Sequence, residues 1–220
     1  MTTNQAAKLV LVCSLLVALG CGNSTDRLIA QLSDADLKIR RAAAHTLAEH
    51  AEEGERVVAA LSTASHDPDV EVREVAVSAL GSLESRAPSS LPALEQALQD
   101  PEVSVRVAAA LAIQKTDPRN KSFAPVLSES LRAGHGPLFI EIGRMGADAD
   151  WAAPTLVALL SDRRASIRAL AAATLGKIGV ADNNVKLALE QRLRDSHLAV
   201  RNAALRALEQ IQSMSAAADP

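Results

Sequence analysis

The chain has 220 residues, of which 48% are hydrophobic and 22% charged, so it can bury a sizeable core and is not a disordered charged tail. Aromatic residues make up 1% of the sequence and the formal net charge is −3. These values exclude the basic patch and the aromatic stacking platforms of a nucleic-acid-binding protein. Alanine and leucine supply the core, and the shortage of β-branched and aromatic runs predicts helices rather than sheets.

The chain begins with a segment typical of export. Lys8 precedes an apolar run over residues 9–19, which is too short to span a bilayer as a helix and fits the hydrophobic region of a secretory signal. The run ends in Ala-Leu-Gly-Cys at residues 18–21, which resembles the lipobox of bacterial lipoproteins, with the usual order of the leucine and the small residue exchanged. The resemblance implies cleavage before Cys21 and acylation of that cysteine with fatty acids such as palmitate. Because Gly22 is not the aspartate that retains many lipoproteins at the inner membrane, it also implies an outer-membrane location facing the periplasm.

An ordinary signal peptide, cleaved near Gly20 or Gly22, is the alternative and would leave Cys21 as a free thiol. Cys13 would be removed with the signal, so Cys21 would have no partner for a disulfide bond. A lipid-bearing cysteine at this place has a use, which favours the anchor. We therefore expect a cleaved signal peptide over residues 1–20, a short tether over 21–26, a repeat region over 27–212 and a C-terminal tail over 213–220.

A motif recurs along the rest of the chain at a nearly fixed interval. It is clearest in residues 67–80, DPDVEVREVAVSAL. Its arginine recurs with a spacing of 33 residues from Arg40 to Arg73, and again from Arg73 to Arg106 and from Arg168 to Arg201. A leucine that precedes the motif recurs with spacings of 33, 33, 33, 29 and 33 residues, which defines six repeats. This leucine stands at Leu28, Leu61, Leu94, Leu127, Leu156 and Leu189.

Each repeat is predicted to be a helical hairpin, in which helix A carries the leucine and helix B carries the arginine. Helix A is predicted over residues 27–33, 55–65, 90–98, 122–132, 152–161 and 182–194. Helix B is predicted over residues 36–50, 69–84, 102–115, 137–146, 164–179 and 196–212. Apolar residues one before, three after and seven after the arginine form a stripe at helical period, and one hairpin alone cannot bury it. The sequence therefore predicts an all-α fold, an α-solenoid of about six stacked hairpins.

The motif resembles the short HEAT-like repeat of the phycobilisome-lyase type, in which aspartate, then valine or isoleucine, then arginine precede an Ala-Ala-Leu pattern. The resemblance covers about residues 27–212. It implies that the aspartate and arginine of successive repeats form a hydrogen-bonded ladder. The residues at these positions are Asp34, Arg40, Asp67, Arg73, Asp100, Arg106, Asp162, Arg168, Asp195 and Arg201.

The fourth repeat departs from the motif. It is four residues shorter, and it has Ala133 at the aspartate position and His135 at the arginine position. Leu138 and Phe139 stand where other repeats have alanine. Sequence drift in one repeat, which its neighbours hold in place, is the simpler interpretation of these changes. The functional alternative is that the repeat bends the solenoid or forms a contact site. The latter predicts a change of superhelical curvature between the third and fifth repeats.

No residue cluster typical of catalysis or metal binding can be singled out. His45 and Glu49 share one face of a predicted helix, but His50 points about 100° away and no third ligand is evident. His66, His135 and His197 lie at turns of separate repeats. No Gly-rich phosphate loop, zinc-type cysteine pair or Ser-His-Asp set is evident. We expect no catalytic activity, no metal and no cofactor.

The predicted function is a membrane-tethered protein-protein interaction scaffold, a monomer that binds an unidentified protein and no nucleic acid. A structural envelope component and a metal- or chromophore-handling enzyme of the HEAT-like lyase or hydroxylase type are the alternatives. The possible interaction surface follows the predicted exposed row of helix B, together with His135. It comprises Arg41, Glu74, Ser78, Val107, Leu111, His135, Asn202 and Arg206.

Overall fold

The computed structural model describes residues 24–49, 54–83 and 88–218. The predicted signal peptide and Cys21 lie outside these residues. The described residues form helices and connecting turns and contain no strand. They divide into two compact units, unit 1 up to Asp117 and unit 2 from Pro118 onward.

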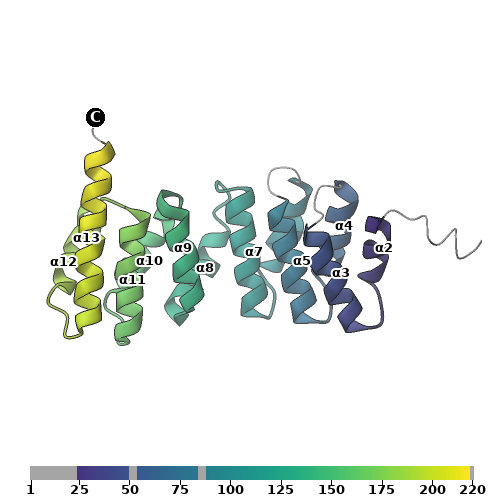
Figure 1. The fold of residues 1–220 in the computed structure, drawn as a ribbon, viewed down its shortest axis with the longest axis horizontal. Coiled ribbons are helices and arrows are strands. Elements are labelled where there is room, and N and C mark those ends of the chain that lie inside the picture. Colours follow the sequence, from purple (N-terminus) through teal and green to yellow (C-terminus); the bar gives the residue numbers. More distant parts are fainter. Residues whose placement is uncertain (1–23, 50–53, 84–87, 219–220) are drawn as a thin grey trace, which may run out of the picture. The chain divides into compact units, whose positions relative to one another are not determined.

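Unit 1 contains the first three repeats. Helix A of these repeats is α2 (Ser24–Gln31), α4 (Glu55–Ala64) and α6 (Leu91–Ala97). Helix B is α3 (Leu37–Glu49), α5 (Val70–Ser82) and α7 (Val103–Thr116), and a short 3-10 helix, η2 (Pro88–Ser90), precedes α6. Helix α5 packs against both α3 and α7, so the B helices of unit 1 form one layer with the A helices behind it (Figure 1).

Unit 2 contains the last three repeats. Helix A is α8 (Phe123–Ala133), α10 (Ala153–Leu159) and α12 (Asn183–Arg192). Helix B is α9 (Gly136–Met145), α11 (Ala165–Ile178) and α13 (Leu198–Ala218). Helix α11 packs against both α9 and α13, which again gives two layers of helices within the unit (Figure 1). The all-α solenoid fold predicted from the repeats is thus confirmed.

Two helix boundaries differ clearly from the prediction, and one further element was not predicted. Helix α2 includes Ser24, Thr25 and Asp26, which the prediction placed in the tether. Helix α13 continues to Ala218 through most of the predicted tail, and Met214 of this extension packs over Gly179 at the end of α11. Residues Gly146–Ala152 form a second 3-10 helix, η3, which was not predicted.

The helices of adjacent repeats approach closely through small residues. We number helix B positions from the arginine of each repeat, or from His135 in the fourth. Gly81 is at position +8 of α5, and a Cβ atom added there would lie 2.5 Å from the Cβ of Ala112, at position +6 of α7. In unit 2, a Cβ at Gly176 would lie 2.6 Å from the Cα of Ala207, at the same two positions. Position +8 therefore faces the following repeat, and position +6 faces the preceding one.

Candidate functional site

The ladder arginines and aspartates of successive repeats are joined within each unit. Arg40 donates from Nε to Asp67 Oδ2 at 2.8 Å and from Nη2 to Asp67 Oδ1 at 3.2 Å. Arg73 binds Asp100 in the same two-pronged way, at 2.7 and 3.1 Å. In unit 2, Arg168 donates to both oxygens of Asp195 at 2.8 Å. The structure thus brings these residues together in the arrangement that the resemblance implies, and two parallel N–H···O bonds fix the spacing of neighbouring repeats.

The remaining nitrogen of each ladder arginine binds its own repeat. Nη1 of Arg73 donates to the backbone oxygen of Asp67 at 3.0 Å, and Nη1 of Arg106 donates to that of Asp100 at 2.7 Å. Equivalent bonds fix Arg40, Arg168 and Arg201 to the turn between helices A and B. Each of the five arginines therefore closes a turn in its own repeat, and Arg40, Arg73 and Arg168 also reach the next repeat.

The ladder lowers the pKa of Asp100 and of Asp195. The hydrogen bond from Arg168 is the main cause that holds the pKa of Asp195 well below its usual range. At Asp100, burial acts to raise the pKa, but the hydrogen bond from Arg73 and the backbone N–H of Glu102 outweigh it, and the pKa is lowered. These carboxylates are therefore ionised at neutral pH and remain paired with the arginines.

Arg164 forms the link between the fourth and fifth repeats that the sequence motif does not supply. It donates to the backbone oxygens of Arg132 and Ala133, both at 3.1 Å, at the end of α8. Its Nε and Nη2 also donate to Asp162, and with the backbone N–H of Arg164 they lower the pKa of Asp162 to about 2. The sequence motif does not identify Arg164, because this residue lies four positions before the motif arginine, Arg168.

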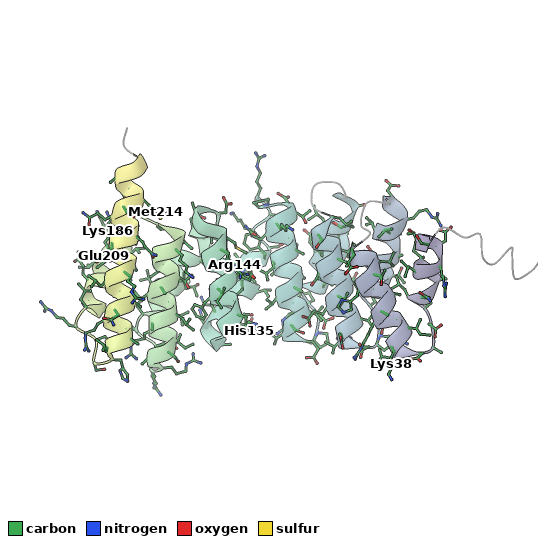
Figure 2. The ribbon with its side chains drawn as sticks, in the orientation of Figure 1. Lys38, His135, Arg144, Lys186, Glu209 and Met214 are labelled. Atoms are coloured by element: carbon green, nitrogen blue, oxygen red, sulfur yellow. The ribbon has the colours of Figure 1, made fainter. Side chains whose placement is uncertain are left out.

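The residues of the predicted interaction surface do not lie on one exposed row. Ser78, His135, Asn202 and Arg206 are exposed, and Figure 2 shows His135 at the start of α9. Glu74 and Leu111 are half-buried. Val107 is only 8% exposed, so its place on an exposed surface is wrong: the apolar side chain is withdrawn from water.

Arg41 is committed to a structural contact. It donates from Nε and Nη2 to the two oxygens of Asp69, at 3.0 and 2.9 Å, and it also pairs with Glu71. Asp69 caps the N-terminus of α5 by accepting from the backbone N–H of Val72. Arg41 therefore ties α3 to the start of α5 and presents no free charge to a partner.

A groove of about 390 Å³ lies between α11 and α13 and includes two residues of the predicted surface, Asn202 and Arg206. Alanines provide its apolar part, and the exposed bases Lys177 and Arg206 stand on opposite helices. Within the described part of the chain, neither base forms an ion pair, so both charges are available to a ligand. The lining residues are Ala173, Lys177, Ala199, Asn202, Ala203, Arg206 and Gln210.

The histidines considered as metal ligands are not gathered into a site. Among residues 24–49, 54–83 and 88–218, no three His, Cys, Asp or Glu side chains are grouped as metal ligands. His45 and Glu49 are both exposed on α3, and His50 lies outside the described residues. Trp151 of η3 packs edge-on against Phe123 of α8, with ring centroids 5.2 Å apart. In the part of the chain that is described, no helix combines the length and apolar character needed to cross a bilayer.

Several solved structures resemble this chain in fold. The complex of CpcE and CpcF of phycocyanin lyase from Nostoc sp. PCC7120 is 24% identical, with a TM-score of 0.53, over 89% of this chain and 79% of that one. E. coli YibA is 18% identical, with a TM-score of 0.56, over 88% and 74% of the two chains. A designed armadillo repeat protein in complex with the peptide (KR)4 is 18% identical, with a TM-score of 0.54, over 86% and 100%. At these identities the likeness concerns the fold alone.

Sequence families give a closer classification. The model of HEAT repeats matches residues 25–114 and 57–142, which together span more than half of the chain. A model of the HEAT repeat associated with sister chromatid cohesion matches residues 177–208. No curated protein matches the sequence. The chain belongs to the HEAT repeat family.

Proposed function

We propose that this protein is a lipid-anchored scaffold that binds an acidic, extended segment of a partner protein in the groove between α11 and α13, without catalysing a reaction. The observation that carries the proposal is that two basic side chains, Lys177 and Arg206, stand on either side of an alanine surface and form no ion pair within the described residues. The HEAT repeat fold supports a protein partner, since stacked helical repeats offer extended surfaces for binding.

The groove favours an extended segment over a folded domain. Packed helices lie about 8–10 Å apart, a distance that an extended chain covers in about three residues. Alanine side chains leave the backbones of α11 and α13 open to close approach, and the amides of Asn202 and Gln210 can both donate to and accept from a peptide backbone. Two carboxylates separated by about three residues would then reach Lys177 and Arg206 together.

The positive charges of Lys177 and Arg206 favour a negatively charged ligand. A carboxylate placed against Arg206 can form two parallel hydrogen bonds, and Lys177 adds a second positive charge. A basic segment would be repelled by both. Because the two bases are exposed, the attraction is screened by salt, and binding should weaken as ionic strength rises.

The test measures binding of a fluorescein-labelled peptide of three Glu-Gly-Ser units to the full-length protein by fluorescence anisotropy. The variant Lys177→Glu/Arg206→Glu should lose at least about tenfold in affinity, which corresponds to about 1.4 kcal/mol. The control Lys186→Glu/Arg194→Glu changes the net charge equally on α12 and the turn that follows, outside the groove. Equal losses in both variants would show a general charge effect and would contradict a groove site, as would a preference for the matching Lys-Gly-Ser peptide.

The anchor rests on the sequence around Cys21, which lies outside the described residues. Two or more acyl chains hold a protein stably at a membrane, and Cys21 is the residue that would carry them. Cells fed a labelled fatty acid should label the wild-type protein and not the Cys21→Ala variant. Acylation of the variant would mean that the anchor has been assigned to the wrong residue. A wild-type protein without label would refute the lipid anchor.

A further inference from the structure

The ladder leaves one arginine without a carboxylate in the last repeat of unit 2. Arg201 is fixed like the other ladder arginines, since its Nη1 donates to the backbone oxygens of Asp195 at 2.7 Å and Ser196 at 3.0 Å. In Arg40, Arg73 and Arg168, Nε and Nη2 then bind the aspartate of the following repeat. Within the described residues, Nε and Nη2 of Arg201 meet no carboxylate. The same donors are thus held in place by the turn and lack their acceptor.

The first repeat of unit 1 has the complementary group. Asp34 corresponds to the aspartates that accept from the preceding repeat. Its Oδ1 accepts from the backbone N–H of Asp36 at 2.8 Å, as Asp67 does from Asp69. In the part of the chain that is described, no arginine reaches the Asp34 carboxylate. The acceptor is therefore present and positioned by its turn, without a donor.

Apolar side chains are uncovered at the same end as Arg201. Position +4 of helix B is at most 1% exposed in Ala44, Val77, Phe139 and Ala172, but Leu205 in α13 is 49% exposed. The residue four after the helix A leucine is similarly buried in earlier repeats, whereas Leu193 is 38% exposed. Both positions face the following repeat elsewhere in the two units. Figure 2 shows that Glu209 and Met214 lie farther along the same helix as Leu205.

The first repeat is open on the opposite side. The residue before the ladder arginine is at most 5% exposed in Val72, Ile167 and Val200, but Ile39 in α3 is 36% exposed. Thr46, at position +6, is half-buried, while Ala79 and Ala207 at that position are buried. Within the described residues, no repeat packs over Ile39 of the first repeat or over Leu205 of the last.

We propose that copies of this protein associate head to tail, with Arg201 of one copy binding Asp34 of the next and Ile39 packing over Leu205. The contact repeats the one found inside each unit, so both charge and apolar surface are matched by the same chain. A second copy fits better than a contact between two identical C-terminal ends, which would bring together two surfaces that both lack the carboxylate. The contact is heterologous and can add further copies, in contrast to the monomer expected from the sequence.

The contact between copies should be weaker than an internal one. Position +8 is glycine in α5 and α11, but it is Glu209 in α13, which holds the helices farther apart. At the other end, Thr46 is larger than the alanines that meet those glycines. The association is therefore reversible and depends on concentration, and it lies outside the groove proposed for a partner.

Sedimentation velocity of the full-length protein in detergent tests the proposal. The wild-type protein should form dimers and larger species as its concentration rises. Asp34→Arg blocks one end and Leu205→Arg blocks the other, so each variant alone should remain monomeric. A mixture of the two should stop at dimers, because each variant keeps the end that the other has lost.

Each outcome decides the matter. A wild-type protein that stays monomeric, an Asp34→Arg variant that still assembles, or a mixture that stays monomeric would overturn the proposal. Assembly blocked by Leu205→Arg alone would instead indicate pairing of C-terminal ends. The mixed sample also controls for folding, because a dimer forms only if both variants are folded. Assembly should persist in Cys21→Ala, and its loss there would assign the association to the lipid.

Discussion

Replacing Gly81 with alanine tests the packing that joins neighbouring repeats. Gly81 lies near the end of α5, and the added Cβ would be 2.5 Å from the Cβ of Ala112 and 2.8 Å from its Cα. Ordinary contacts between such atoms are about 3.5–4.0 Å, so helices α5 and α7 must separate. Because one of the clashing atoms belongs to the backbone, a change of side-chain rotamer cannot relieve the clash.

Two effects of opposite sign set the size of the change. Alanine favours a helix over glycine by up to about 1 kcal/mol, and less near the end of a helix. Overpacking of a tightly packed site costs about 1–3 kcal/mol. The clash is larger than the propensity gain, so Gly81→Ala should reduce the free energy of unfolding by about 1–2 kcal/mol.

A double-mutant cycle in urea, followed by circular dichroism, isolates the contact. Ala112→Gly removes the opposing methyl group but leaves the Cα, so the double variant should be more stable than the sum of the single changes predicts, by about 0.5–1 kcal/mol. Gly143→Ala is the matched control, because its Cβ would meet only the flexible side chain of Lys177, with Cδ at 2.8 Å. It should be neutral or slightly stabilising. The close packing inferred between repeats is wrong if Gly81→Ala has the same effect on stability as Gly143→Ala. It is also wrong if the stability changes of Gly81→Ala and Ala112→Gly are additive.

Three further predictions concern the ladder. Arg73→Ala should lower the free energy of unfolding by about 1–3 kcal/mol, a larger loss than Arg106→Ala causes. The reason is that Arg73 binds both a carboxylate and its own turn, whereas Arg106 binds its own turn. Urea denaturation of the two variants measures the difference. Arg164→Ala should increase hydrogen exchange at the end of α8 and leave unit 1 unchanged, since it releases the oxygens of Arg132 and Ala133; unchanged exchange would show that Arg164 is merely solvated. The folded pKa of Asp162, about 2, lies below its ordinary value of 3.8, so its pairing stabilises the fold above about pH 4 and is lost as the pH falls toward 2. The melting temperature of the wild-type protein should drop over this interval more than that of an Asp162→Asn variant, and parallel curves would refute the linkage.

The hairpins could be predicted from sequence because two independent signals coincide in each repeat. The spacing of 33 residues fixes the length of the unit, and the apolar stripe of helix B fixes which face is buried. Val72 and Leu80 illustrate this, since both follow the pattern and both are fully buried. The ladder pairing was expected from the family motif alone, and the structure adds its geometry.

The 3-10 helix η3 could not be predicted, because GADADWA carries no apolar period. Its position follows from tertiary contacts: Trp151 packs against Phe123, and Gly146 has a φ of +58°, which glycine adopts without strain. The extension of α13 depends likewise on the contact of Met214 with Gly179, which no local pattern reveals. The groove required knowledge of which helices are neighbours, since Lys177 and Arg206 lie on different repeats. The predicted change of curvature around the fourth repeat stays a prediction.

Arg164 shows why the fourth repeat can lose its motif and still belong to the stack. Ala133 cannot offer a carboxylate to another repeat, and His135 does not cap α9 with its side chain. The backbone oxygens at the end of α8 nevertheless need donors, because polar groups left unpaired at a packed turn cost about 1–3 kcal/mol. An arginine from the following repeat supplies them and is itself held by Asp162. In the fourth repeat, as in the others, a guanidinium group therefore binds the backbone oxygens of the turn. The difference is that the arginine belongs to the following repeat instead of the same one.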